Sequence, residues 1–194
     1  MKRLVSFVPF ALLLAACTII PRGEDPQEIF WSRLQALCGQ AFPGRVTTTE
    51  AGDNQLAAAR LVIHVASCAP NEVRIAFHAS LDRSRVWVIS RTASGLSLTH
   101  IHRGEDGREE VRSHYGGETP NSGTALRQDF PANARTRALF RREDISEASA
   151  NIWSIPILPG RTFGYAIARP GRHLHIDFDL SRPVRAPGPA WGER

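Results

Sequence analysis

The sequence predicts a mainly β protein: a single antiparallel barrel or sandwich of about eight to nine strands, with a lipocalin-like barrel favoured and one helix at the amino-terminal end. Three observations support this prediction. Apolar and polar residues alternate in many short segments, turns containing Gly or Pro separate these segments, and a capped helical segment precedes them. The 194 residues, 42% hydrophobic and 22% charged, fit one globular domain.

Residues 1–16 have the features of a bacterial export signal. Lys2 and Arg3 precede a mostly apolar run that ends at Leu14. This run is shorter than the roughly 20 residues that a membrane-spanning helix needs. We therefore expect the segment to be removed after export.

The Leu-Ala-Ala-Cys sequence at 14–17 resembles the lipobox of bacterial lipoproteins, in which the cysteine becomes the acylated first residue. The resemblance implies a diacylated Cys17 and a membrane tether over 17–24, and two acyl chains hold a protein firmly on a bilayer. Because Thr18 rather than aspartate follows the cysteine, it also implies a lipid anchor in the outer membrane, and we expect the protein to face the periplasm. The alternative is a plain secretory signal with an incidental cysteine.

Cys38 and Cys68 are the cysteines left in a chain exported to an oxidising compartment, so we expect them to form a disulfide. Closing a loop of 31 residues, counted from 38 to 68, stabilises a fold by about 3 to 4 kcal/mol in the chain-entropy model. The alternative, a reactive thiol or a metal ligand, lacks the close Cys-x-x-Cys spacing of redox and zinc motifs.

The globular domain is expected over 25–182 and begins with a helix that runs to residue 37 or 38. Asp25 can cap its free amides, Pro26 suits its first position, and Glu28 can complete a capping box. Gly39 supplies the stop. The apolar side of this helix consists of Ile29, Phe30, Leu34 and Leu37.

Period-two patterning predicts strands after a polar linker around 47–55. The expected strands are 60–66, 72–78, 86–90, 96–102, 108–115, 152–158, 162–168 and 172–180. The last three form a meander, and Pro156 predicts an edge, a bulge or a bend in the first of them. A loop at 116–123, a short helix at 133–142 and an irregular tail at 183–194 complete the chain.

Paired histidines give one candidate site. Residues i and i+2 of a strand point to the same face, so each of two strands can present two imidazoles. The pairs are His100 with His102 and His173 with His175. A zinc or copper site is possible if the two strands are neighbours, and ordinary surface contacts are the alternative. No other cofactor is implied.

Aromatic residues on the expected strands give a second candidate, a ligand cavity inside the barrel lined by Phe77, Trp87, Trp153 and Tyr165. The alternative is that they fill a solid core, since a barrel of about eight strands has room for either.

An enzyme is less favoured than a binding protein. The sequence has no nucleophile elbow, metalloprotease helix or phosphate-binding glycine loop. Ser113, His114 and Tyr115 lie beside Gly116 and Gly117, but the glycine pair answers a backbone need more simply. A hydrolase is therefore the third hypothesis.

Net charge argues against a nucleic-acid partner. The formal charge of the whole chain is +5, and removing Lys2 and Arg3 with the signal leaves 22 basic and 19 acidic residues. The basic residues alternate with acids, as in 105–110 and 141–144, which is typical of a mixed solvated surface.

Several short segments occur in a characteristic order. They are Phe-Trp-Ser-Arg-Leu-Gln-Ala-Leu-Cys-Gly at 30–39, Arg-Gly-Glu-Asp-Gly at 103–107, Tyr-Gly-Gly-Glu-Thr at 115–119, Gly-Thr-Ala at 123–125, Phe-Pro-Ala at 130–132 and Leu-Phe-Arg-Arg at 139–142. In this order they resemble a family of small secreted or lipid-anchored proteobacterial proteins without an assigned activity. The resemblance implies no catalytic residues. We therefore expect an envelope lipoprotein that binds a small apolar ligand or a partner protein.

Overall fold

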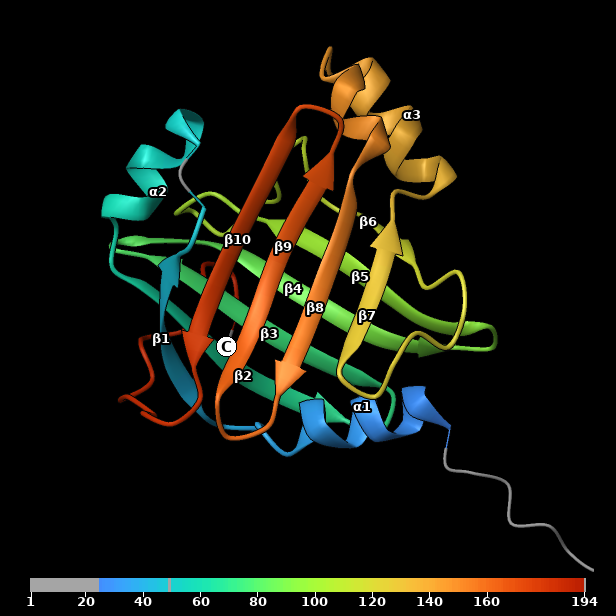
Figure 1. Cartoon of the computed structure of the whole chain (residues 1–194). Helices are drawn as coiled ribbons and strands as arrows, with labels where there is room; N and C mark the ends of the chain where they lie inside the picture. Colours follow the sequence, from blue (N-terminus) through green and yellow to red (C-terminus); the bar gives the residue numbers. More distant parts are fainter. Residues whose placement is uncertain (1–24, 49, 194) are drawn as a thin grey trace, which may run out of the picture.

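Within the residues that the structure describes, ten antiparallel strands form a single sheet that curls into a nearly closed barrel (Figure 1). The computed structural model describes residues 25–48 and 50–193, so the expected signal peptide, Cys17 and tether lie outside the described residues. The mainly β, barrel-like fold expected from the sequence is confirmed, with ten strands instead of eight or nine.

The strands are β1 (Ala41–Val46), β2 (Leu61–Ala69), β3 (Glu72–Ala79), β4 (Asp82–Thr92), β5 (Gly95–His102), β6 (Tyr115–Glu118), β7 (Arg127–Pro131), β8 (Ile152–Leu158), β9 (Thr162–Arg169) and β10 (Arg172–Asp179). The α-helices are α1 (Pro26–Gln35), α2 (Asn54–Ala58) and α3 (Ala134–Arg142), and the 3-10 helices are η1 (Ala51–Asp53) and η2 (Ser146–Ala150).

Strands that follow one another in the chain are also neighbours in the sheet, from β1 to β6 and from β7 to β10. β1 pairs with β10 as well as with β2, so the two halves of the chain join within the sheet. This is the strand order of an up-and-down barrel, and β6 and β7 are its two free edges.

Gly116 and Gly117 close the barrel at this junction. Gly117 forms an isolated β-bridge with Ala132. The hydroxyl of Thr136, at the start of α3, donates to the Gly116 carbonyl at 2.7 Å and accepts from the Gly116 amide at 2.7 Å. A Cβ on Gly116 would lie 1.8 Å from the carbonyl oxygen of Leu98. The two glycines are therefore required because neighbouring backbone lies too close for a side chain, in agreement with the structural role expected from the sequence.

Two strands, β1 and β7, lie where the sequence pattern predicts no strand, and β6 occupies the first part of the loop expected at 116–123. In the sequence, Pro43 and Gly44 of β1 resemble a turn. In the structure, Gly44 leaves room for the ring of Phe178, because a Cβ at this position would lie 2.4 Å from that ring. β7 is mostly polar, and one of its two buried side chains is Gln128. Gln128 is satisfied in the interior because it donates to the carbonyl of Ser122 at 3.0 Å. Neither β1 nor β7 shows the alternation of apolar and polar residues that predicts a strand.

The strand expected at 108–115 is wrong. Its charged residues remain at the surface in a loop, and β6 begins at Tyr115. Pro156 lies neither at an edge nor at a bulge, because β8 is paired on both sides and its register with β9 is the same before and after the proline. Within the ladder to β9, Ile155 and Pro156 themselves have no partner. Gly164 on β9 accommodates the proline ring, since a Cβ there would lie 2.5 Å from Pro156 Cγ.

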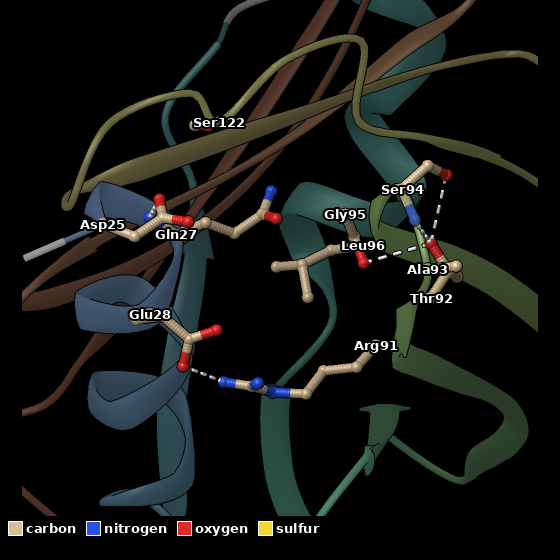
Figure 2. A pocket seen from close by; sticks show the side chains of 10 residues that line it. All are labelled: Asp25, Gln27, Glu28, Arg91, Thr92, Ala93, Ser94, Gly95, Leu96 and Ser122. Atoms are coloured by element: carbon tan, nitrogen blue, oxygen red, sulfur yellow. Dashed lines mark hydrogen bonds and ion pairs between the residues drawn. The ribbon is translucent and has the colours of Figure 1, made fainter.

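α1 seals one end of the barrel (Figure 1). Asp25 caps it by accepting a hydrogen bond from the Gln27 amide at 3.0 Å. Glu28 does not complete a capping box and instead pairs with Arg91, beside a polar surface hollow of about 330 Å³ (Figure 2). The residues that α1 buries are Phe30, Trp31 and Leu34, with Trp31 in the place expected for Ile29.

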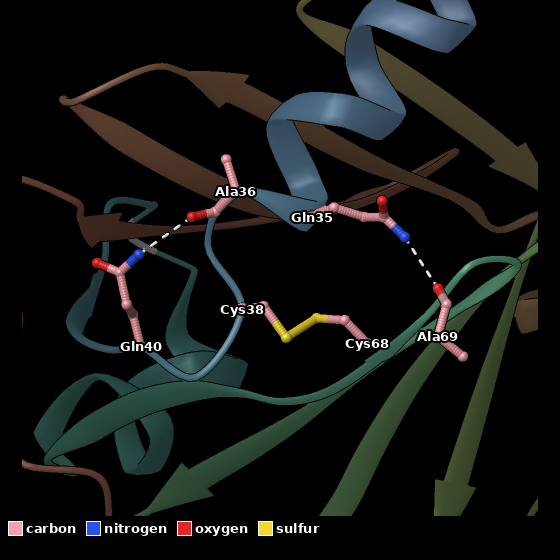
Figure 3. The surroundings of a disulfide bond; sticks show 6 residues. All are labelled: Gln35, Ala36, Cys38, Gln40, Cys68 and Ala69. Atoms are coloured by element: carbon pink, nitrogen blue, oxygen red, sulfur yellow. Dashed lines mark hydrogen bonds between the residues drawn. A yellow bond between two sulfur atoms is a disulfide. The ribbon is translucent and has the colours of Figure 1, made fainter.

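A disulfide joins the end of α1 to β2. Cys38 and Cys68 are bonded, with a Cα–Cα distance of 6.1 Å (Figure 3). Beside the bond, the Gln35 side chain donates to the carbonyl of Ala69 at 2.9 Å. The bond therefore fixes the helix that closes the barrel to the strand beside it.

The carboxy-terminal tail lies on the outer face of β3, β4 and β5. Ala190 packs there with Val86, Val88 and Ile101. The Trp191 amide donates to the carbonyl of Arg83 at 3.0 Å. The irregular tail is thus part of the packed domain.

His78 is buried on this outer face with 3% exposure, and neither ring nitrogen has a hydrogen-bond partner among the residues that the structure describes. Burial, with smaller contributions from His64 and Arg83, lowers the pKa of His78 to about 4, against a small opposing effect of Asp82. The folded protein therefore holds this ring neutral at neutral pH.

Replacing Cys38 and Cys68 by serine should destabilise the domain by about 3 to 4 kcal/mol, because the unfolded chain gains the entropy of the opened loop. Urea unfolding of the oxidised protein and of the double variant measures this difference. Reductant should destabilise the wild-type protein and leave the double variant unchanged. Equal midpoints for the two oxidised proteins would contradict the structural role of the bond.

Replacing His78 by leucine should reduce the dependence of stability on pH. The pKa of His78 is lower in the folded than in the unfolded protein, so stability is lost as pH falls from about 6.5 towards 4. About 2 kcal/mol of the loss between pH 7 and pH 5 comes from this group. Urea unfolding at both pH values tests this, with His173→Leu at an exposed site as the control. The prediction fails if both variants keep the wild-type pH dependence.

Candidate functional site

Three stacked aromatic rings cross the interior of the barrel. The ring centroids of Phe77 and Trp87 are 5.1 Å apart with an interplanar angle of 14°, and those of Trp87 and Tyr165 are 4.1 Å apart at 6°. Trp87 lies on β4 and Tyr165 on β9, which are not neighbours in the sheet. The stack therefore spans the lumen. Below it, α1 and the core side chains fill the barrel.

Above the stack, the barrel opens into a cavity of about 610 Å³, here called the cup. The lining of the cup includes residues of η1 and α2, of the β3–β4 turn and of β9 and β10. Figure 1 shows α2 at the end of the barrel opposite α1. Its apolar wall includes Leu56, Ala59, Ala79, Ile167 and Leu174. A volume of this size and a mixed wall are typical of small-molecule sites.

A network of histidines and tyrosines forms one wall of the cup. His100 Nδ1 lies 3.3 Å from the carbonyl oxygen of Tyr115, which can only accept, so this nitrogen carries the proton. His100 Nε2 then accepts from the Tyr165 hydroxyl at 2.8 Å. His102 Nε2 lies 3.0 Å from the Tyr115 hydroxyl. The network is therefore satisfied with both rings neutral.

Burial determines the protonation of this wall. It lowers the pKa of His100 to about 3, with His102 as a smaller cause. It lowers the pKa of His102 to about 4, together with the positive charge of Arg85. Burial also raises the pKa of Tyr115 to about 12 and that of Tyr165 well above its usual value. The four groups are uncharged at neutral pH.

Two arginines bring charge to the cup. Arg85 donates from Nη1 to Asp82 at 2.5 Å. Arg172, at the rim, donates to Asp53 at 2.8 Å and also pairs with Glu50. The hydrogen bond to Asp53 is the largest cause of the raised pKa of Arg172. Through this pair, β10 holds the segment that contains η1 and α2 at the mouth.

Of the four aromatic residues expected at a ligand cavity, Phe77, Trp87 and Tyr165 lie at the base of the cup. Trp153 lies behind the polar wall, with its ring centroid 5.1 Å from that of His100. The sequence analysis did not identify Arg85 as a site residue. Arg85 is two residues from Trp87 on β4, so both side chains point to the interior of the barrel. The spacing of two residues from an inward-facing tryptophan is the sequence signal that could have identified Arg85.

The four histidines considered for a metal site do not come together. His100 and His102 face the interior from β5, whereas His173 and His175 lie on the outer face of β10. β5 and β10 are not adjacent strands, so the condition for a shared site is not met. Within residues 25–48 and 50–193, no cluster of three or more His, Cys, Asp or Glu side chains is arranged to hold a metal ion.

The residues considered for a hydrolase do not form a catalytic set. Ser113 Oγ accepts a hydrogen bond from the backbone amide of His102 at 3.1 Å. His114 is instead paired with Glu109 at 2.7 Å in a surface loop. The described part of the chain shows no hydrogen bond between Ser113 and a histidine ring.

No family model, curated protein or solved structure matches the chain. Among the described residues, no helix is both long and apolar enough to span a membrane.

Replacing Asp53 by asparagine should loosen the segment over the mouth, because Arg172 loses a nearly buried charged partner. Amide hydrogen exchange in 51–58 should accelerate by about tenfold, while the global free energy of unfolding changes less. Asp129→Asn, which removes an exposed ion pair with Arg127, is the matched control. Unchanged exchange in the Asp53 variant would mean that the pair does not hold this segment.

Proposed function

We propose that this protein is a binding protein whose cup holds a small molecule with an apolar body. One observation carries the proposal: the aromatic stack and α1 close the lower barrel, whereas the upper barrel keeps a cavity of about 610 Å³ with an apolar wall. A barrel that served only as a scaffold gains stability from filling such a space. The uncharged histidines and tyrosines add a few fixed polar groups, as in other ligand sites.

We also propose that Cys17 is lipidated and anchors the protein to the outer membrane, on the periplasmic side. Seven residues separate Cys17 from Asp25, so the eight steps between them reach at most about 29 Å. Because α1 begins at the closed end of the barrel, such a tether would leave the cup accessible from the aqueous compartment. Metabolic labelling with a fatty acid tests the anchor, and a Cys17→Ser variant that still incorporates label would overturn it.

The neutral fluorophore N-phenyl-1-naphthylamine provides a direct test of the cup. The soluble chain from Thr18 should bind it saturably, with increased fluorescence. Ala59→Trp fills the cup from the α2 side and should weaken binding by about tenfold, since displacing roughly 60 Å² of apolar contact costs about 1.4 kcal/mol.

Ala57→Trp is the matched control. Ala57 lies on α2 but is exposed and does not line the cup, so this variant should bind like the wild type. Absence of saturable binding, or equal binding by the two tryptophan variants, would overturn the proposed function.

A further inference from the structure

Arg85 is a cation on the inward face of the barrel. It precedes Trp87 by two residues on β4, so both side chains point to the same side of the sheet. Its neighbours across the sheet are Phe77 on β3 and His102 on β5, which also line the cup. The guanidinium carbon lies 6.0 Å from the centre of the Phe77 ring. Core packing gives no reason for an arginine at this position.

The Arg85 side chain is held in place without using all its donors. Asp82 accepts one hydrogen bond from Arg85 and another from the Ser84 amide at 2.8 Å, which fixes the carboxylate. A guanidinium has five N–H groups. The remaining donors of Arg85 have no protein acceptor among the residues that the structure describes, and the side chain is 35% exposed where it lines the cup. These donors are free for a ligand.

Asp82 occupies one donor of Arg85, and the donors that remain suit a single carboxylate on the ligand. Two carboxylates line the cup within the described residues: Asp82 is paired with Arg85, and Asp53 with Arg172. Arg172 donates to Glu50 as well as to Asp53, so it has fewer free donors to offer than Arg85. A single guanidinium fork matches a carboxylate, whereas a dianionic phosphate needs further cations.

Uncharged hydrogen-bonding groups extend the site. His102 and Tyr115 lie beside Arg85, and their side chains are hydrogen-bonded to each other at 3.0 Å. The positive charge of Arg85 lowers the pKa values of His102, Tyr115 and Tyr165, so its field reaches three of the four groups of the polar wall. The apolar residues Leu56, Ile167 and Leu174 line the same cavity.

We infer that the cup binds a small amphipathic monocarboxylate, with Arg85 receiving the carboxylate, His102 and Tyr115 completing its surroundings, and the apolar wall covering the body of the ligand. This inference rests on the proposed function, because it assigns a ligand class to the same cavity. Beyond the proposed function, the inference states that the free donors of Arg85 recognise the head group through charge-assisted hydrogen bonds.

Decanoate, decanol and decylamine share one apolar chain and differ in the head group, so they separate the two claims. Displacement of N-phenyl-1-naphthylamine gives their dissociation constants for the soluble chain. Decanoate should bind about ten- to a hundredfold more tightly than decanol, which corresponds to a charge-assisted hydrogen-bond pair. Decylamine should bind most weakly.

Arg85→Gln should weaken decanoate binding and so remove the preference for decanoate over decanol. Arg83→Gln is the matched control, since Arg83 lies on the same strand but faces the tail, and it should keep the wild-type preference. The comparison of the three compounds needs only the wild-type protein, so it remains decisive if Arg85→Gln does not fold.

The outcomes distinguish the two claims. Equal affinity for decanoate and decanol in the wild-type protein, or an unchanged preference in folded Arg85→Gln, would overturn the carboxylate inference and leave the binding function standing. If none of the three compounds displaces the fluorophore and the fluorophore itself does not bind saturably, the proposed function fails as well.

Discussion

The stack of Phe77, Trp87 and Tyr165 determines which part of the barrel is filled and which part is open. Its three rings reach from β3 and β4 across the lumen to β9, so they join two walls that the sheet itself does not pair. Stacked aromatic pairs are worth about 0.5 to 1.5 kcal/mol beyond the area they bury. Below the stack, α1 completes a solid core. Above it, the same walls carry polar side chains that are hydrogen-bonded to one another.

Closure of the barrel depends on small residues where two backbones approach closely. Gly116 and Gly117 let β6 lie against β5 and against the segment after β7, and the Thr136 hydroxyl satisfies the backbone there. Gly44 similarly leaves room for Phe178 beside β1. The disulfide and the tail then fix the outside of the same barrel. The cup is therefore formed by a scaffold that close backbone contacts, a disulfide and the tail hold together.

The sequence predicts the parts of this protein that follow a simple period. The carboxy-terminal meander, α1 and its cap, the fold class and the Cys38–Cys68 bond are visible from alternation, capping residues and cysteine number. β1 and β7 are not, because Pro43 and Gly44 resemble a turn and Gln128 is buried by hydrogen bonds instead of hydrophobicity. The cup follows only from knowing which distant strands face each other across the lumen.

The central claim is that the upper barrel is a binding site and that Arg85 receives the acidic end of the ligand. A crystal structure of the soluble chain grown with decanoate tests both parts at once. The account predicts density for the chain between Leu56 and Leu174, with the carboxylate within hydrogen-bond distance of the Arg85 guanidinium. An empty cup in the presence of saturating decanoate, or a carboxylate that points to solvent away from Arg85, would contradict it.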